Sequence, residues 1–185
     1  ASSIEACVSS NTNLFITVDC GITGAEYVDF LNGLNIDTVI TDHHQPETIL
    51  PDAKAIVNPV LDGDTPYSEM AGVGVAWMVL KAVYELLDAD GDVLNELLQL
   101  VAIGTVTDVV GLIDDNRILV AAGLKLLRTN AFPGISALAE SASVDIHEIN
   151  STDLAYYLGP RLNACGRIGN AADAVRLLPA GSAEE

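Results

Sequence analysis

The first third of the chain alternates short β-branched runs with an amphipathic segment. The run LFITV (14–18) is continuously apolar, which is typical of a strand buried on both faces. Residues 37–41 (DTVIT) and 54–58 (KAIVN) have a similar character. Between the first two runs, residues 23–34 place apolar side chains at helical spacing, at Ala25, Val28, Phe30, Leu31 and Leu34. Strand, helix and strand joined by short links predict a parallel βαβ unit.

The start of this helix has its own signal. Thr23 is a possible N-cap, and Glu26 follows three residues later, which predicts a capping box. The preceding Gly21 permits a tight exit from the first strand.

The pattern changes after Pro66 to long segments with helical periodicity. Four such segments are expected to form helices, at 71–87, 92–110, 116–129 and 132–141. The fold class is therefore α/β, a parallel sheet with flanking helices, followed by a mostly helical second half. We expect the division to fall between residues 1–66 and 67–185.

Composition adds a strong charge imbalance. The 185 residues include 26 acidic and only 8 basic side chains, a net charge of −18. Such a surface repels polyanions by default. Half of the residues are apolar and the acids are scattered, so disorder does not follow. One hypothesis is a halophilic adaptation, because high salt screens the self-repulsion of a strongly negative surface.

Targeting signals are not apparent. The chain has no run of about 18 apolar residues that would predict a membrane span, and its first residues do not resemble a signal peptide. Cys7, Cys20 and Cys165 are odd in number and form no metal-binding pair. We therefore expect a reducing, cytoplasmic location with no membrane partner.

Candidate metal ligands follow two neighbouring strands. Asp19 comes directly after the first run, and Asp42, His43 and His44 come directly after the second. The carboxyl ends of parallel strands face the ligand crevice in open sheets, so these side chains are expected at one rim. Carboxylate with imidazole suits Mn²⁺, Fe²⁺, Zn²⁺ or Co²⁺, whereas Mg²⁺ favours sites richer in oxygen.

A structural explanation competes with the metal site. A single Asp after a strand is usually a helix cap, and a single His is usually structural. Adjacent histidines point in different directions, however, so both rarely serve packing. With an acid on each of two strand ends, the pattern favours a metal site.

Two further segments have candidate chemistry. Asp108 lies in a segment otherwise without charge, 97–112, where an unpaired buried carboxylate would be costly. It is either an N-cap or a hydrogen-bonded structural acid, or it is another metal ligand. In YYLGPRLNACGRIGNA (156–171), Arg161 and Arg167 flank Asn163 among glycines. Arginine suits phosphate, although a surface pair balancing nearby acids is the alternative.

The motifs VDCG, TDHH, AGVGVAW, GTVTDVV and GPRLNACGR, in this order, resemble the DHH phosphoesterase superfamily, specifically its RecJ-type single-strand exonucleases. The segments span residues 18–167, most of the chain. The last segment favours the RecJ branch over the inorganic pyrophosphatases of the superfamily. AGVGVAW does not form a dinucleotide fingerprint, because Trp77 replaces the third glycine. We interpret it as the start of a tightly packed helix.

The resemblance implies a role for each candidate residue. Asp19, His43 and Asp108 match ligands for a Mn²⁺ or Mg²⁺ pair, with Asp19 bridging. His44 matches a catalytic histidine near the scissile phosphate, and Asp42 an acid that orients the histidine pair. The implied chemistry is two-metal phosphodiester hydrolysis. The segment that matches the phosphate-binding residues contributes Arg161, Asn163 and Arg167.

The chain also departs from the family pattern. An upstream Asp-x-Asp-Gly motif and a C-terminal substrate-binding domain are expected but are absent from these 185 residues. The segment DADG (88–91) follows a helical pattern, so we interpret it as a helix-to-helix turn. We therefore expect a fragment of a catalytic domain, with little nuclease activity and weak metal binding alone.

Three functions are compatible with these features. The first is a 5′–3′ single-stranded DNA exonuclease in repair and recombination. The second is a catalytically silent scaffold that binds replication proteins, although a scaffold has no need for a polar metal rim. The third is a phosphodiesterase for short oligonucleotides or small molecules. The acidic surface argues against DNA binding, but divalent ions and the arginine segment would supply local positive charge.

Overall fold

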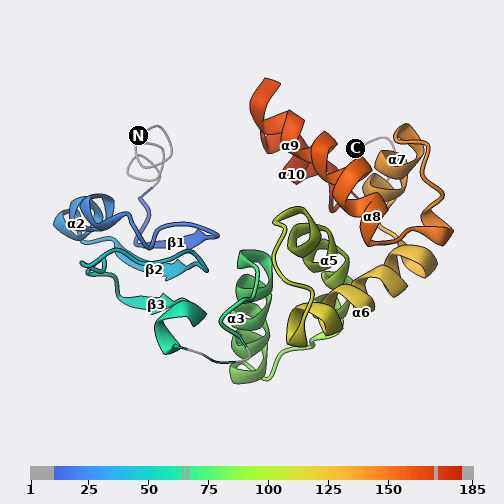
Figure 1. Cartoon of the computed structure of the whole chain (residues 1–185). Helices are drawn as coiled ribbons and strands as arrows, with labels where there is room; N and C mark the ends of the chain where they lie inside the picture. Colours follow the sequence, from blue (N-terminus) through green and yellow to red (C-terminus); the bar gives the residue numbers. More distant parts are fainter. Residues whose placement is uncertain (1–10, 64, 66, 169–170, 181–185) are drawn as a thin grey trace. The chain divides into compact units, whose positions relative to one another are not determined.

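The computed structural model describes residues 11–63, 65, 67–168 and 171–180, with the side chains of 166–168 excepted (Figure 1). The chain divides into two compact units, residues 1–79 and 80–185. Helix α3 (Gly72–Leu86) crosses this boundary.

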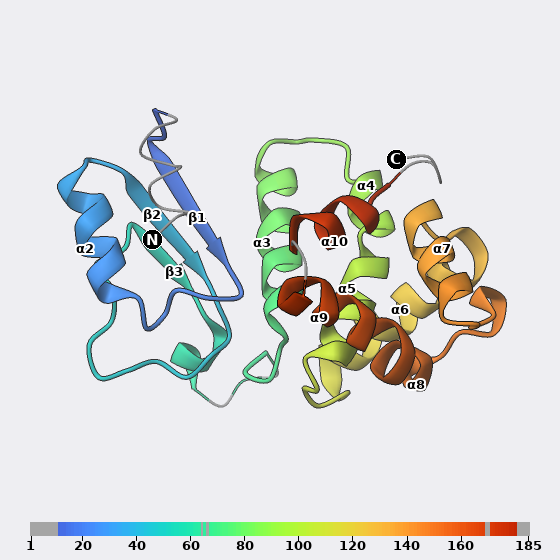
Figure 2. The same cartoon turned by 90° about the horizontal axis from the view of Figure 1, so that it is seen from above.

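The first unit contains a parallel sheet in the order β1–β2–β3. Its strands are β1 (Leu14–Val18), β2 (Asp37–Thr41) and β3 (Ala55–Val57), and they run in the same direction (Figure 2). Helix α2 (Ala25–Gly33) makes the crossover from β1 to β2. The register pairs Val18 with Thr41, and Thr41 with Val57, so the three strands end together. The predicted βαβ unit and α/β fold class are confirmed.

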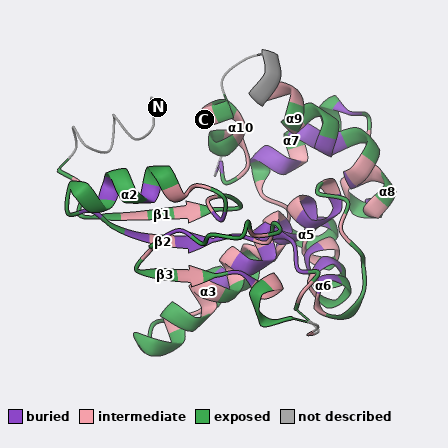
Figure 3. Cartoon of the chain, turned by 60° about the vertical axis from the view of Figure 1, so that its left-hand side comes forward, coloured by how far each residue is buried: buried purple, intermediate pink, exposed green. Residues whose placement is uncertain are grey.

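The expectation that β1 is buried on both faces is wrong. The central strand β2 buries Thr38 and Ile40 almost completely (Figure 3). In β1 burial alternates, and every second side chain remains about half exposed: Leu14 (48%), Ile16 (55%) and Val18 (54%). The described residues do not cover the face of β1 that carries these three side chains, so a continuous apolar run did not indicate burial on both faces.

The predicted capping box is also wrong. Helix α2 begins at Ala25, its N-cap is Gly24, and no side chain caps it. The apolar residues of the helix do not all face the sheet, because Val28 and Leu31 are buried whereas Phe30 is 54% exposed. Helical spacing therefore located the helix correctly but overestimated the width of its buried face.

The second unit is helical, as expected, with more breaks than the sequence indicated. The predicted helix 92–110 divides at Leu97 into α4 (Asp92–Glu96) and α5 (Leu98–Thr107). Helices α6 (Asp114–Asn130) and α7 (Pro133–Ser141) match the other two predictions. The chain continues through short turns, η2 (Ile146–Glu148) and α8 (Ser151–Asp153), to a π-helical turn, η3 (Leu154–Leu158), α9 (Gly159–Ile168) and α10 (Ala171–Leu177).

Helices α5 and α6 pack together at the centre of this unit. Ala102, Ile103, Val120 and Leu127 are among its buried residues. The buried Gln99 of α5 fixes the corner between α6 and α7, because its Oε1 accepts from Phe132 N (2.9 Å) and its Nε2 donates to Asn130 O (3.2 Å). A buried polar side chain is tolerated here because it is hydrogen-bonded.

The remaining connections fit the expected pattern. Residues 88–91 link α3 to α4, and residues 88–90 are exposed, as expected of the turn predicted for the DADG segment. A short 3₁₀ turn, η1 (Pro59–Asp62), follows β3. In the described part of the chain, no single helix is long and apolar enough to cross a membrane, and only the pair α6–α7, bent by 87°, meets that test when joined.

Candidate metal centre

The exits of β1 and β2 bring three potential ligands together. Asp19, His43 and His44 each offer a ligand atom, and these atoms lie within 4.8 Å of one another. Nε2 of His43 is 3.1 Å from Oδ1 of Asp19, and the centroids of the two imidazole rings are 4.5 Å apart. The side chain of His43 is 11% exposed and that of Asp19 is 56% exposed, so the group has a buried side and an open side.

The backbone explains why Asp19 turns toward the histidines. Its N–H still donates to Thr41 O (2.9 Å), which continues the ladder between β1 and β2. Its φ is 62°, in the left-handed region that Asp tolerates better than most residues, so the chain leaves the strand at this point. Gly21 follows with φ of 114°, which confirms the predicted glycine exit.

Asp42 is the polar anchor behind the group and is 1% exposed. Its Oδ2 accepts from Ile22 N (2.9 Å), and its Oδ1 accepts from His43 N (2.8 Å) and His44 N (3.2 Å). Nδ1 of His44 also lies 2.7 Å from this Oδ1. One carboxylate therefore ties the exit of β1 to the exit of β2 and orients an imidazole.

The pKa values of the groups around Asp42 reflect these contacts. Burial alone would raise the pKa of Asp42, but the hydrogen bonds from Ile22 N–H, the His44 ring and the two backbone N–H groups hold it below its usual value. The pKa of the Cys20 thiol is raised by burial and by the negative charges of Asp42 and Asp19. The local potential is therefore negative and favours a cation.

Asn58 fixes the third strand exit to the same loop. It is 4% exposed, its Nδ2 donates to His44 O (2.9 Å), and its Oδ1 accepts from Val60 N (3.0 Å). The sequence analysis did not select Asn58. Its position at the end of the third β run was the available signal, because that run ends at the same edge as the other two.

Gly72 in the AGVGVAW segment lies where a larger side chain would collide with Asp19. It is the first residue of α3, and a β-carbon at this position would lie 2.7 Å from Asp19 Cγ and 3.0 Å from Asp19 Cβ. The absence of a side chain therefore lets the start of α3 approach Asp19, where the positive end of the helix dipole favours a carboxylate. The sequence indicated a tightly packed helix start but not its neighbour.

Replacing Gly72 by alanine is expected to lower Mn²⁺ affinity about 10-fold or more, because Asp19 must move. Metal affinity is sensitive to the residues that hold a ligand in position. Alanine should not weaken the helix itself, since its helix propensity exceeds that of glycine by about 1 kcal/mol. Calorimetric titration with Mn²⁺ measures the effect. Gly33→Ala in α2 is the matched control, because a β-carbon there meets nothing within 4 Å. Equal affinity in both variants would contradict this role.

The second unit contains the other candidates. The uncharged segment before Asp108 is largely buried, but Asp108 itself is exposed and is the C-cap residue of α5, so no carboxylate is buried there. Val109 follows with φ of 62°, which is uncommon for a β-branched residue. A carboxylate at a helix C-terminus is not stabilised by the helix dipole, whose negative end lies there.

The predicted phosphate segment lies beside the end of α5. Gly159 at the start of α9 packs against Thr107, and a β-carbon there would meet the Thr107 methyl group. Arg161 is exposed and its NH1 donates to Tyr157 O (2.7 Å), and Asn163 is exposed. Arg167 belongs to α9, but its side chain lies outside the described residues. The structure therefore brings the Asp108 and Arg161 segments together within this unit.

The chemistry of the first group fits a divalent ion. The ligand types are one carboxylate oxygen and two imidazole nitrogens. Because Nδ1 of His44 faces the Asp42 carboxylate, Nε2 is the nitrogen left to face an ion or a substrate phosphate. An acid behind a metal-binding histidine is the usual arrangement that fixes its tautomer and orientation. The mixed oxygen and nitrogen set suits Mn²⁺ better than Mg²⁺.

Comparison with known proteins identifies the family. The model for the DHH family, N-terminal domain, matches residues 1–105. The chain belongs to the DHH family. Over 167 residues it is 44% identical to the single-stranded-DNA-specific exonuclease RecJ of Bacillus subtilis (strain 168), a match that covers 90% of this chain and 20% of that protein.

Solved structures give the same result for this DHH chain. It superposes with a TM-score of 0.85 and 33% identity on exonuclease RecJ bound to manganese, covering 99% of this chain and 46% of that one. The TM-score is 0.86, at 32% identity, for RecJ in complex with Mn²⁺ from Thermus thermophilus, of which 27% is covered. The chain therefore spans less than half of these relatives, and the resemblance to RecJ inferred from its motifs is confirmed.

Proposed function

We propose that this DHH chain carries part of the centre of a metal-dependent phosphodiesterase that degrades single-stranded DNA from its 5′ end. The observation that carries the proposal is the group of Asp19, His43 and His44 at two strand ends, with Asp42 behind it. The Bacillus subtilis relative is named as specific for single-stranded DNA, which supports the same substrate class for this chain.

Each residue has a proposed task. Asp19 and His43 hold Mn²⁺ or Mg²⁺, and Asp42 orients His44 so that its Nε2 can act at the scissile phosphate. A bound divalent ion supplies Lewis-acid stabilisation of phosphate charge and lowers the pKa of water. We keep Asp108 as a further ligand, because it is exposed at the end of α5, beside the segment that carries Arg161, where it can meet an ion.

The phosphate segment is proposed to position the strand. Arg161 and Asn163 are exposed in α9 and can meet a phosphate, and Arg167 is assigned on its motif alone. With only 8 basic residues in 185, metal ions would supply much of the positive charge that DNA binding needs. Because the proposed substrate is DNA, we also propose that the protein acts in the cytoplasm, in DNA repair and recombination. Replication proteins are its proposed protein partners.

A hybrid exonuclease tests this function. The 167-residue matched segment of the Bacillus subtilis RecJ is replaced by this chain, and release of mononucleotides from end-labelled single strands is followed with Mn²⁺. The proposal expects degradation that requires a 5′-accessible single strand and is lost in His43→Ala. A folded hybrid without turnover, or one that cleaves only dinucleotides, would contradict it. His147→Ala is the control, since His147 is the one histidine in the sequence outside the TDHH motif.

The net charge of −18 also leads us to propose tolerance of high salt. Screening shortens the reach of surface repulsion from about 10 Å at 0.1 M salt to about 3 Å at 1 M. The free energy of unfolding is therefore expected to rise between 0.1 M and 1 M KCl, as measured by urea denaturation. Stability that falls or stays constant over this range would contradict a halophilic adaptation.

A further inference from the structure

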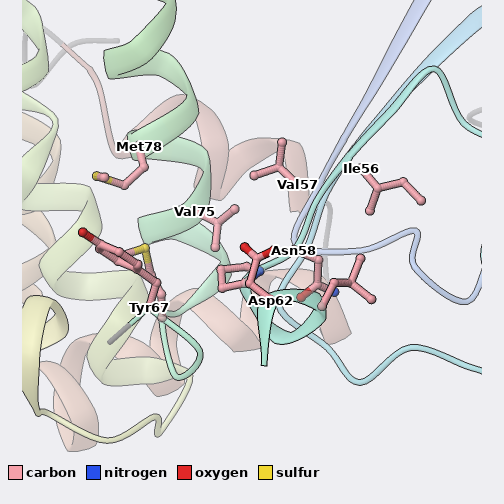
Figure 4. Close-up of a pocket in the computed structure, with 10 residues that line it drawn as sticks. Ile56, Val57, Asn58, Asp62, Tyr67, Val75 and Met78 are labelled. Atoms are coloured by element: carbon pink, nitrogen blue, oxygen red, sulfur yellow. The ribbon is translucent and has the colours of Figure 1, made fainter. Parts of the chain in front are cut away.

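A cavity of about 340 Å³ lies at the C-terminal end of β3, within the first unit (Figure 4). Its lining comes from β3, η1, the segment before α3 and the first turns of α3. The volume is in the range of sites for small organic ligands, about 300–1,000 Å³. The proposed function assigns no role to this cavity.

The cavity is tied to the metal centre by the backbone. Asp42 N donates to Val57 O (3.0 Å), so the last residue of β3 lies beside the start of the histidine loop. Asn58, which lines the cavity, donates from Nδ2 to His44 O (2.9 Å). The cavity and the metal centre are therefore neighbours, and one ligand can reach both if it has one part suited to each.

The lining chemistry defines the part that enters the cavity. Val57, Val75, Met70 and Met78 supply apolar surface, and Tyr67, which is 46% exposed, supplies an aromatic face. Methionine sulfur and aromatic rings both pack well against flat π systems. Asn58 and Asp62 are the polar side chains among the lining residues.

Charge excludes a phosphate from this cavity. The described lining contains no cationic side chain and includes the carboxylate of Asp62, so an anion would be repelled. A planar neutral group with hydrogen-bonding edges fits better. A nucleotide combines such a group, its base, with a phosphate that the neighbouring metal centre attracts.

We propose that this cavity is a nucleobase subsite for the nucleotide whose phosphate lies at Asp19, His43 and His44. The assignment rests on the proposed function of the metal centre. A base in this subsite is unstacked and unpaired, so the terminal pair of a duplex would have to open at an energetic cost. The subsite thus contributes to selectivity for single strands through Tyr67 and the apolar lining.

Binding to the 185-residue chain in the presence of Mn²⁺ tests the subsite by calorimetry. The probes are deoxyadenosine 5′-monophosphate and 2-deoxyribose 5-phosphate, which differ by the base. The nucleotide is expected to bind about 5- to 100-fold more tightly, the usual range for a base stacked on an aromatic side chain. Tyr67→Ala should remove this difference, and Tyr67→Phe should retain it. Tyr27→Ala is the matched control, because Tyr27 of α2 is 51% exposed.

Each alternative outcome is distinct. Equal binding of the two probes, or an equal loss of both in Tyr67→Ala, would overturn the subsite. Equal binding of indole and deoxyadenosine would also overturn it, because the cavity would then accept any apolar side chain. Deoxyadenosine binding that depends on Tyr67 in a chain that fails to bind Mn²⁺ would keep the subsite and reject the proposed metal function.

Discussion

Replacing His43 by alanine is expected to lower Mn²⁺ affinity at least about 100-fold. Loss of a residue behind a metal ligand typically costs about 10- to 100-fold, and loss of the ligand itself should cost no less. The side chain of His43 is 11% exposed and its Nε2 lies 3.1 Å from Asp19, so a replacement water would not be held as firmly. Calorimetry or electron paramagnetic resonance of free Mn²⁺ measures the change.

The other histidine in the chain supplies the control for this experiment. His147 lies in the second unit, is exposed, and its Nδ1 is 3.0 Å from Arg128 O. His147→Ala should leave Mn²⁺ affinity unchanged. If both alanine variants bind Mn²⁺ like the original chain, the group at the strand ends is not the metal centre.

Replacing Asp42 by alanine is expected to lower the free energy of unfolding by about 3 kcal/mol, because the substitution leaves one buried donor and three partly buried donors without an acceptor. These donors are Ile22 N, His43 N, His44 N and the His44 ring. Urea denaturation followed by the fluorescence of Trp77, the single tryptophan, measures the loss. Asp29→Ala on the exposed side of α2 is the control and should change stability by less than about 0.5 kcal/mol.

The same carboxylate predicts a pH dependence. The pKa of Asp42 is lowered in the folded chain, so its ionised form stabilises the fold above the unfolded pKa of about 3.9. This contribution is lost as the pH falls through the lower, folded pKa. The difference in stability between the original chain and Asp42→Ala should therefore be constant near neutral pH and shrink below about pH 4. A difference that grows on acidification would contradict the assignment.

The local sequence pattern was sufficient to locate most helices and strands of the first unit. The β-branched runs located β2 and β3 to within a residue or two at each end, and helical spacing located α2 and α3. Local pattern failed where burial depends on neighbours. The run Leu14–Val18 looked buried on both faces, and Thr23 looked like a cap, yet half of β1 is exposed and α2 has no side-chain cap.

For the candidate metal centre, the sequence by itself determined the residue types and their place after two parallel strands. It followed that Asp19, His43 and His44 would meet at one edge, because parallel strands end at a common edge. Only the tertiary structure decided that Asp42 is buried behind them, that Asn58 anchors the loop, and that Gly72 makes room for Asp19. The contacts of Asn58 with His44, of Asp42 with Ile22 and of Gly72 with Asp19 join residues 14, 20 and 53 positions apart, and they depend on packing that no local pattern encodes.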